Sequence, residues 1–143
     1  MYKKILCLIF LCVNFAFFAM EKGENKGKEM GKAVLALIFS FKSGNAGISN
    51  ISRSIRQLQG LRQKKFASQK IIESCDTDGD TLLHASAMCG NPALFSMVMQ
   101  LSINENITNN NGQMPVDVLQ AFDDDNHKLC LKFYAQYQDC LKK

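Results

Sequence analysis

The sequence predicts an all-α fold. Apolar residues recur every three or four positions between Ile48 and Leu61, which places them along one side of a helix. A segment beginning at Asp76 returns 33 positions later, at Asn109, and this period is typical of stacked helical repeats. Among 143 residues 47% are hydrophobic and 21% charged, a composition that disfavours disorder throughout the chain.

The first 19 residues have the form of an export signal. Two lysines precede an apolar run from Ile5 to Ala19, and its 15 residues are too few for a comfortable permanent membrane span. We expect cleavage after Ala19 and a secreted or extracytoplasmic protein. Phe17 occupies a position where signal peptidases prefer a small residue, so an uncleaved membrane anchor remains the alternative.

Residues 20–42 are expected to form a linker and a short apolar segment. Residues 20–32 are rich in Lys, Glu, Gly and Asn, which is typical of a flexible linker. Residues 33–41 are apolar but too short to cross a membrane. We expect them to form a helix that packs on the domain or adheres to a surface.

A helical hairpin is predicted over residues 48–72. Its first helix carries the apolar stripe from Ile48 to Leu61, with Ser49 or Asn50 as a possible N-cap. The second helix is expected from Arg62 to Ile72, with Gly60 ending or kinking the first.

Four cysteines follow the predicted signal, and they are Cys75, Cys89, Cys130 and Cys140. An even number in an exported chain permits disulfides without requiring them. None has the spacing of a zinc or redox motif, so buried thiols are the preferred interpretation.

The repeated segment has turn and cap chemistry in both copies. Asp76-Thr-Asp-Gly79-Asp-Thr81-Leu-Leu-His84 returns as Asn109-Asn-Asn-Gly112-Gln-Met-Pro-Val-Asp117. The two glycines suit a tight turn of positive φ, and Thr81 suits the N-cap of the helix that follows. Gly90 is expected to end that helix, and Pro92 to begin the next.

These residues resemble the ankyrin repeat, whose pattern D-x-x-G-x-T-P-L-H-x-A-A the first copy follows closely. Leu82 departs from the usual Pro, which the second copy restores as Pro115, while Asp117 stands in place of His. The resemblance implies an ankyrin-repeat solenoid of stacked helix-turn-helix units with short protruding fingers. It also implies that His84 hydrogen-bonds between adjacent repeats.

The expected ankyrin-repeat domain spans residues 43–143, because stacked repeats need about three units for stability. Residues 43–75 form a degenerate first repeat or N-terminal cap, 76–108 a repeat, and 109–143 the last repeat and C-terminal cap. In the last helix, residues 126–141, we expect three side chains to face inward, namely Leu129, Phe133 and Tyr137.

The resemblance implies a module that binds another protein, with no catalysis and no cofactor. The family uses its finger tips and inner helices for contact. Carried over by position, the contact residues are Thr77, Asp78, Asp80, Ala85, Met88, Asn110, Asn111 and Gln113. The partner is unknown, and we expect a monomer.

A basic segment supports a second hypothesis, a protein that associates with an anionic membrane surface through residues 48–70 and 33–41. Between Glu29 and Glu73 no acidic residue occurs. The candidate contacts are Arg53, Arg56, Arg62, Lys64 and Lys65. Phe66 is the segment's only aromatic residue, so a stacking platform for nucleic acid is not expected. A solvated helix face is the simpler interpretation.

Two other clusters are interpreted as structural. Asp76, Asp78 and Asp80 lack the glycine and glutamate positions of an EF-hand loop, so no metal is expected there. His84 and Cys89 are five positions apart and do not share a helix face, so no thiolate relay is expected.

Overall fold

A computed structural model describes residues 26–44, 47–64 and 67–142. The predicted signal and its cleavage site lie outside these residues. All the regular elements described are helices, which confirms the all-α class. They are α2 (Lys26–Ser43), α3 (Ile48–Gln63), α4 (Gln69–Ile72), α5 (Leu82–Cys89), α6 (Pro92–Met99), α7 (Pro115–Gln120) and α8 (Asp125–Leu141).

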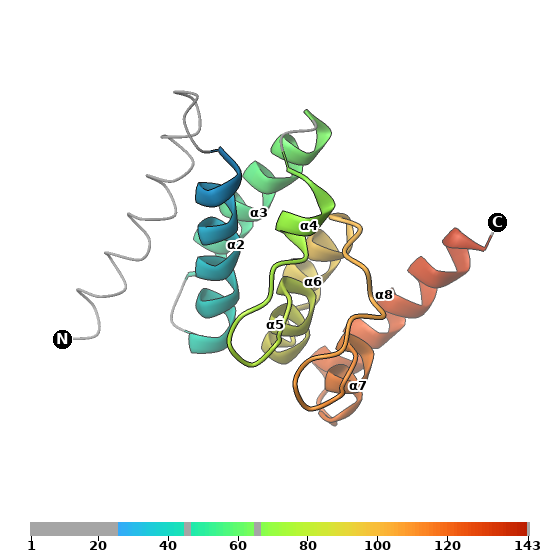
Figure 1. Cartoon of the computed structure of the whole chain (residues 1–143). Coiled ribbons are helices and arrows are strands. Elements are labelled where there is room, and N and C mark those ends of the chain that lie inside the picture. The colour runs from blue at the N-terminus through green and yellow to red at the C-terminus, as the bar shows by residue number, and fades with distance from the viewer. Residues whose placement is uncertain (1–25, 45–46, 65–66, 143) are drawn as a thin grey trace.

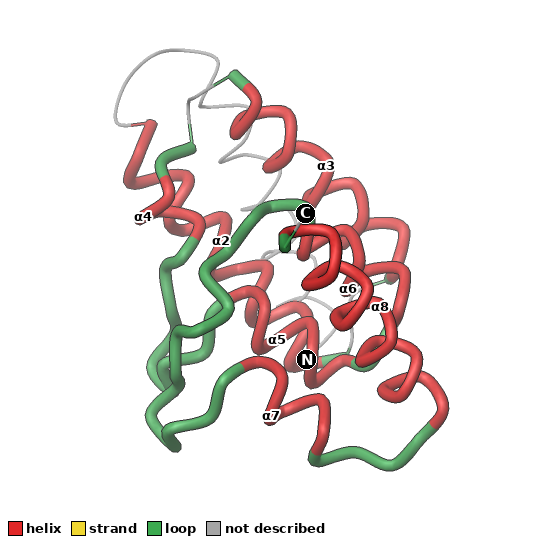
Figure 2. The backbone as a smooth tube through the Cα atoms, turned by 90° about the vertical axis from the view of Figure 1, so that its right-hand side faces the viewer, coloured by secondary structure: helices red, strands yellow, loops and turns green. Residues whose placement is uncertain are grey.

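The longer helices form two rows of three (Figures 1 and 2). In one row α2 contacts α5 and α5 contacts α7, and in the other α3 contacts α6 and α6 contacts α8. Contacts between α2 and α3, between α5 and α6, and between α7 and α8 join the rows into three stacked pairs. The first and last pairs therefore form the two ends of the molecule.

Helix α2 is part of the core, so the linker predicted for residues 20–32 is wrong from Lys26 onward. Its inward side chains recur at helical spacing and are at most 3% exposed; they are Met30, Val34, Leu37, Ile38 and Phe41. Each such burial stabilises the fold by about 1.5–3 kcal/mol. The apolar segment 33–41 packs on the domain, which confirms one of its two expected roles.

The hairpin predicted over residues 48–72 is also wrong in its second half. Helix α3 passes through Gly60 and ends at Gln63, and its N-cap is Gly47, which provides no side-chain hydrogen bond. The second helix shrinks to the four residues of α4. Residues 62–65 are all polar, so they offer no apolar side chain that would bury a second helix against the core. The helix that pairs with α3 in the first helix pair is α2, and not a helix that follows α3.

Helix α5 begins and ends, and helix α6 begins, at the residues that the sequence predicts. The hydroxyl of Thr81 accepts the amide hydrogen of His84 at the start of α5, and Gly90 ends the helix with φ of 62°. Asn91 caps α6, where its side chain accepts the amide hydrogen of Leu94, and Pro92 is the first helical residue.

Helix α8 faces the core with a different side from the predicted one. His127 and Cys130 are buried, whereas Leu129 is 42% and Phe133 37% exposed, so their inward assignment is wrong. Only Tyr137 of the predicted stripe packs against the core. The neighbours of α8 are α6 and α7, and its apolar spacing alone does not identify which side of the helix they cover.

Of the four cysteines described, only Cys130 is buried, so the buried-thiol prediction fails for the other three. All four are free thiols. Burial, with smaller contributions from Cys89 and Asp124, raises the pKa of Cys130 to about 11. Within residues 26–142 as described, no helix has the length and apolar character needed to span a membrane.

Candidate binding surface

Two short loops of the same construction precede α5 and α7. In the first finger, residues 76–80, the amide of Asp76 donates to the carbonyl oxygen of Asp80 at 3.1 Å, and Gly79 donates back to Asp76. The side-chain oxygen Oδ1 of Asp76 also accepts the amide hydrogens of Asp78 and Asp80, each at 3.0 Å. One aspartate side chain thus replaces the missing backbone partners of a tight turn.

The second finger, residues 109–113, repeats these bonds 33 positions later. The amide of Asn109 donates to Gln113, and Gly112 donates back to Asn109. Oδ1 of Asn109 accepts the amide hydrogens of Asn111 and Gln113, each at 3.0 Å. Gly79 and Gly112 have φ of 77° and 73°, as the turns require. The internal repeat is therefore a repeat of hydrogen bonds, although Gly79 and Gly112 are its only identical residues.

The two fingers lie side by side, among the loops at the lower left of Figure 2, and hydrogen bonds join them. Asn110 donates from its backbone amide to the carbonyl oxygen of Asp78 and from its side chain to that of Thr77, both at 2.9 Å. The amide of the Asn109 side chain donates to Oδ1 of Asp80 at 2.9 Å. These hydrogen bonds hold the two loops together beneath their exposed tips.

His84 links the start of α5 to the second finger. Its Nδ1 accepts the amide hydrogen of Thr81 at 3.2 Å, so the ring proton belongs on Nε2. Nε2 lies 2.9 Å from the carbonyl oxygen of Gln113, to which it donates. The side chain is 0% exposed, and this confirms that His84 bridges the two repeated segments.

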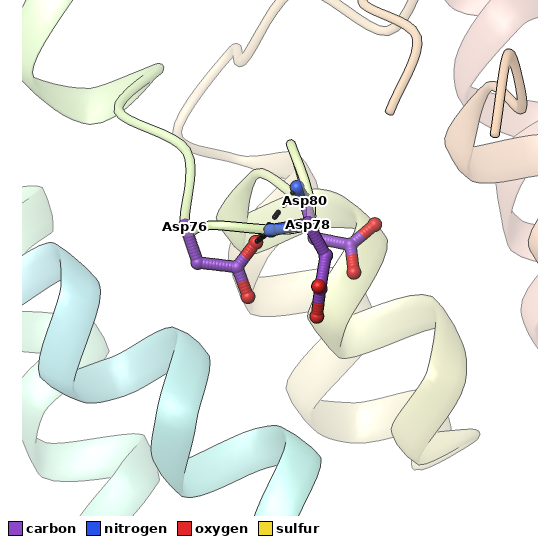
Figure 3. A group of neighbouring side chains, drawn as sticks. All are labelled: Asp76, Asp78 and Asp80. Carbon is purple, nitrogen blue, oxygen red and sulfur yellow. Dashed lines mark hydrogen bonds between the residues drawn. The ribbon is translucent and has the colours of Figure 1, made fainter. Parts of the chain in front are cut away.

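Lys42, at the end of α2, joins the first finger to the end pair of helices. Its Nζ donates to Asp76 at 2.9 Å, to Asp78 at 2.7 Å and to Asp80 at 2.8 Å. Figure 3 shows these three carboxylates gathered at the loop. Candidate ligand atoms of the three lie within 4.8 Å of one another, close enough for one cation, and the lysine ammonium contacts all of them.

The opposite charges of Lys42 and Asp76 stabilise each other. Partial burial opposes charge on Lys42, but the hydrogen bonds that it donates to the three aspartates and the charge of Asp80 outweigh this effect and raise the pKa of Lys42. Burial likewise opposes charge on Asp76, yet the bond from Lys42 and two backbone amides lower the pKa of that carboxyl. At neutral pH the lysine is therefore positive and Asp76 negative.

The predicted contact residues divide by exposure. Thr77, Asp78, Asn110 and Asn111 are exposed on the finger tips, whereas Met88 and Gln113 are half-buried. Asp80 is 2% and Ala85 0% exposed, so neither can contact a partner, and these two assignments are wrong. Asp80 faces inward because Lys42 and the second finger both bond its carboxylate.

A groove of about 710 Å³ runs between α2 and the first finger. Local sequence patterns predict neither this groove nor the role of Lys42, because both depend on contacts between segments more than thirty positions apart. Its lining residues are Leu35, Phe39, Lys42, Ser43, Cys75, Asp76, Thr77 and Asp78.

The predicted basic contacts lie largely on α3. Arg53, Arg56 and Lys64 are exposed and Arg62 is half-buried, while Lys65 lies outside the described residues. No ion pair joins these four side chains to an acidic residue in the described part of the chain. The apolar residues 33–41 that were to assist them at a membrane mostly face the core.

No protein-family model matches this chain, and comparisons with curated proteins and with solved structures found no match.

Proposed function

We propose that this chain is an exported ankyrin-repeat module that binds a protein partner through its two finger tips. The observation that carries the proposal is the pair of identically bonded fingers, 33 positions apart and hydrogen-bonded to each other. Two rows of helices with fingers between successive pairs agree with ankyrin architecture. We place the first repeat at α2 and α3, in place of residues 43–75.

The finger tips suit recognition because their side chains are exposed on a rigid base. Bonds between Asn110 and Thr77 and between Asn109 and Asp80 hold both loops in place before a partner arrives. A preorganised loop loses little conformational entropy on binding, so its contacts contribute more to affinity. We propose a binding role without catalysis, since the buried His84 is fully engaged in structural bonds.

The test is affinity capture with the chain immobilised and bound proteins quantified by mass spectrometry. A variant carrying Thr77→Lys and Asn111→Lys changes two exposed tips and should reduce capture of the true partner by about tenfold or more. Ala135→Lys, an exposed change on α8, is the matched control. A partner retained equally by all three proteins would place the binding site elsewhere.

Export is tested separately. Mass spectrometry of the N-terminus of protein recovered outside the producing cells should find Met20, if cleavage follows Ala19 as the sequence predicts. Protein retained in the membrane with Met1 attached would instead support the uncleaved anchor.

The arginines of α3 favour a second candidate, binding to an anionic membrane surface, because Arg53 and Arg56 are exposed and no acidic residue in the described part of the chain pairs with them. The variant Arg53→Gln, Arg56→Gln, Arg62→Gln leaves the buried stripe of α3 intact. Sedimentation with vesicles containing anionic lipid should show binding that weakens as salt rises and is lost in this variant. Equal binding by the variant and the wild type, or none by either, would remove this candidate.

A further inference from the structure

The two ends of the helix stack both expose apolar side chains. Among the described residues the exposed large apolar side chains lie on or beside the end pairs, and none lies on α5 or α6; they are Leu35, Phe39, Ile48, Phe122, Leu129, Phe133 and Leu141. Stacked-repeat proteins ordinarily cover their ends with polar caps. Exposed apolar side chains at both ends therefore indicate surfaces that another molecule covers.

The exposed sides of the two end helices carry the same order of side chains. On α2 the basic Lys32 precedes Leu35 and Phe39, which are 40% and 52% exposed. On α8 the acidic Asp125 precedes Leu129 and Phe133 at similar helical spacing. We call these the α2 side (Lys32, Leu35, Phe39) and the α8 side (Asp125, Leu129, Phe133).

From this correspondence we propose that copies of the chain associate head to tail, with the α2 side of one copy packed on the α8 side of the next. Two helices laid parallel in this way bring the apolar pairs together and place Lys32 beside Asp125. Opposite charges at the edge of an apolar contact favour one orientation over the others. The groove between α2 and the first finger, about 710 Å³ and bordered by Leu35 and Phe39, offers room for a phenylalanine such as Phe133.

The net charge of the chain also differs in sign between its two ends, as the charges of Lys32 and Asp125 do. Residues 26–72, which include α2 and α3, carry ten basic side chains and one acidic, whereas residues 73–143 carry four basic and ten acidic. Head-to-tail contact brings the positive end of one copy to the negative end of the next, while head-to-head contact opposes like charges. The charges therefore disfavour a symmetric dimer through either end.

A contact between two different sides can repeat, so the association is open-ended and rises with concentration. This proposal goes beyond partner binding at the fingers and replaces the expectation of a monomer. It concerns the end helices, and the exposed tips of Thr77 and Asn111 are not required for it.

The experiment is sedimentation velocity over a concentration series, on the chain beginning at Met20, which contains every described helix. The α2 variant carries Leu35→Gln and Phe39→Gln, and the α8 variant carries Leu129→Gln and Phe133→Gln. Because all four side chains are at least 37% exposed, both variants should stay folded and lose little stability, which thermal melts check. Ala135→Gln, exposed on another flank of α8, is the control.

We expect the wild type and the control to form dimers and larger species, and each variant alone to remain monomeric. An equimolar mixture of the two variants should form a dimer and nothing larger, because one intact α2 side then meets one intact α8 side. A wild type that stays monomeric at hundreds of micromolar overturns the proposal. So does a variant that still dimerises alone, which indicates a symmetric contact, or a mixture that stays monomeric.

Discussion

Lys42 and Asp80 form the ion pair that joins the first pair of helices to the first finger, with Nζ and Oδ2 2.8 Å apart. The Asp80 side chain is only 3% exposed, and its two carboxylate oxygens accept hydrogen bonds from this lysine and from the side-chain amide of Asn109. A buried carboxylate that loses a partner destabilises the fold.

Replacing Lys42 by Met should therefore lower the free energy of unfolding by about 1–2 kcal/mol, a value reduced for the partial exposure of the lysine. Urea denaturation measures the change. The matched control is Lys32→Met, which removes a more exposed pair with Glu29 and should cost about 0.5 kcal/mol or less. Equal effects of the two substitutions would contradict a structural role for Lys42.

Acid should destabilise the protein in part through Asp76. Its pKa is lower in the folded chain, so its contribution is present above the ordinary aspartate value, near ~4, and is lost as pH falls through the folded value. Urea midpoints measured from pH ~6 to ~3 should fall less steeply for Asp76→Asn than for the wild type. Parallel pH profiles would exclude Asp76 as a source of acid sensitivity.

Calcium should have little effect on the wild type, because the ammonium of Lys42 already contacts the three carboxylates of the first finger. Millimolar calcium should move the melting temperature by less than about 1 °C. Lys42→Ala frees the carboxylates, and calcium should then stabilise this variant weakly, as a site of few ligands does. A large, chelator-reversible shift in the wild type would mean that calcium displaces the lysine.

Some features of the fold are determined by residues that are close together in the sequence, and these features are predictable. The turns at Gly79 and Gly112 and the caps at Thr81 and Gly90 depend on residues near in sequence, and they were predicted. The bridging role of His84 was implied by the resemblance to the ankyrin repeat, and the structure shows its bond to Gln113. Helix α2 was missed over its first residues because Gly27 and Gly31 interrupt a charged segment that reads as a linker.

Other features depend on contacts between segments that are far apart in the sequence, and local sequence patterns do not specify these contacts. The apolar spacing of α8 identifies a helix, but it does not show that Leu129 and Phe133 face away from α6 and α7. Asp80 has the same type of side chain as the exposed Asp78, and Lys42 contacts both, so the hydrogen bond from Asn109 is what distinguishes the buried carboxylate. Tertiary contacts of this kind decide which predicted contact residues are accessible.

The two finger glycines should tolerate substitution differently, although both have positive φ. A Cβ at Gly79 would lie 2.8 Å from the backbone nitrogen of Asn110, whereas a Cβ at Gly112 would meet nothing within 4 Å. Gly112→Ala should cost about 1–2 kcal/mol from backbone strain alone. Gly79→Ala should cost more, because the fingers must also separate. Thermal melts compare the two, and a smaller loss at Gly79 would contradict the side-by-side arrangement.

Neighbouring positions on α2 provide the sharpest test that this helix belongs to the folded domain. Ile38 is 0% exposed against the core, while Phe39, one position later, is 52% exposed. Ile38→Ala removes buried apolar atoms and leaves a cavity, so it should lower the free energy of unfolding by about 2–4 kcal/mol. Phe39→Ala has the larger change in side chain but should cost about 1 kcal/mol or less, because little of its contact area lies in the core. If residues 26–43 were a detached linker, both substitutions would leave the urea midpoint unchanged. A loss confined to Ile38 requires that α2 pack on α5 with the side that the structure assigns to it.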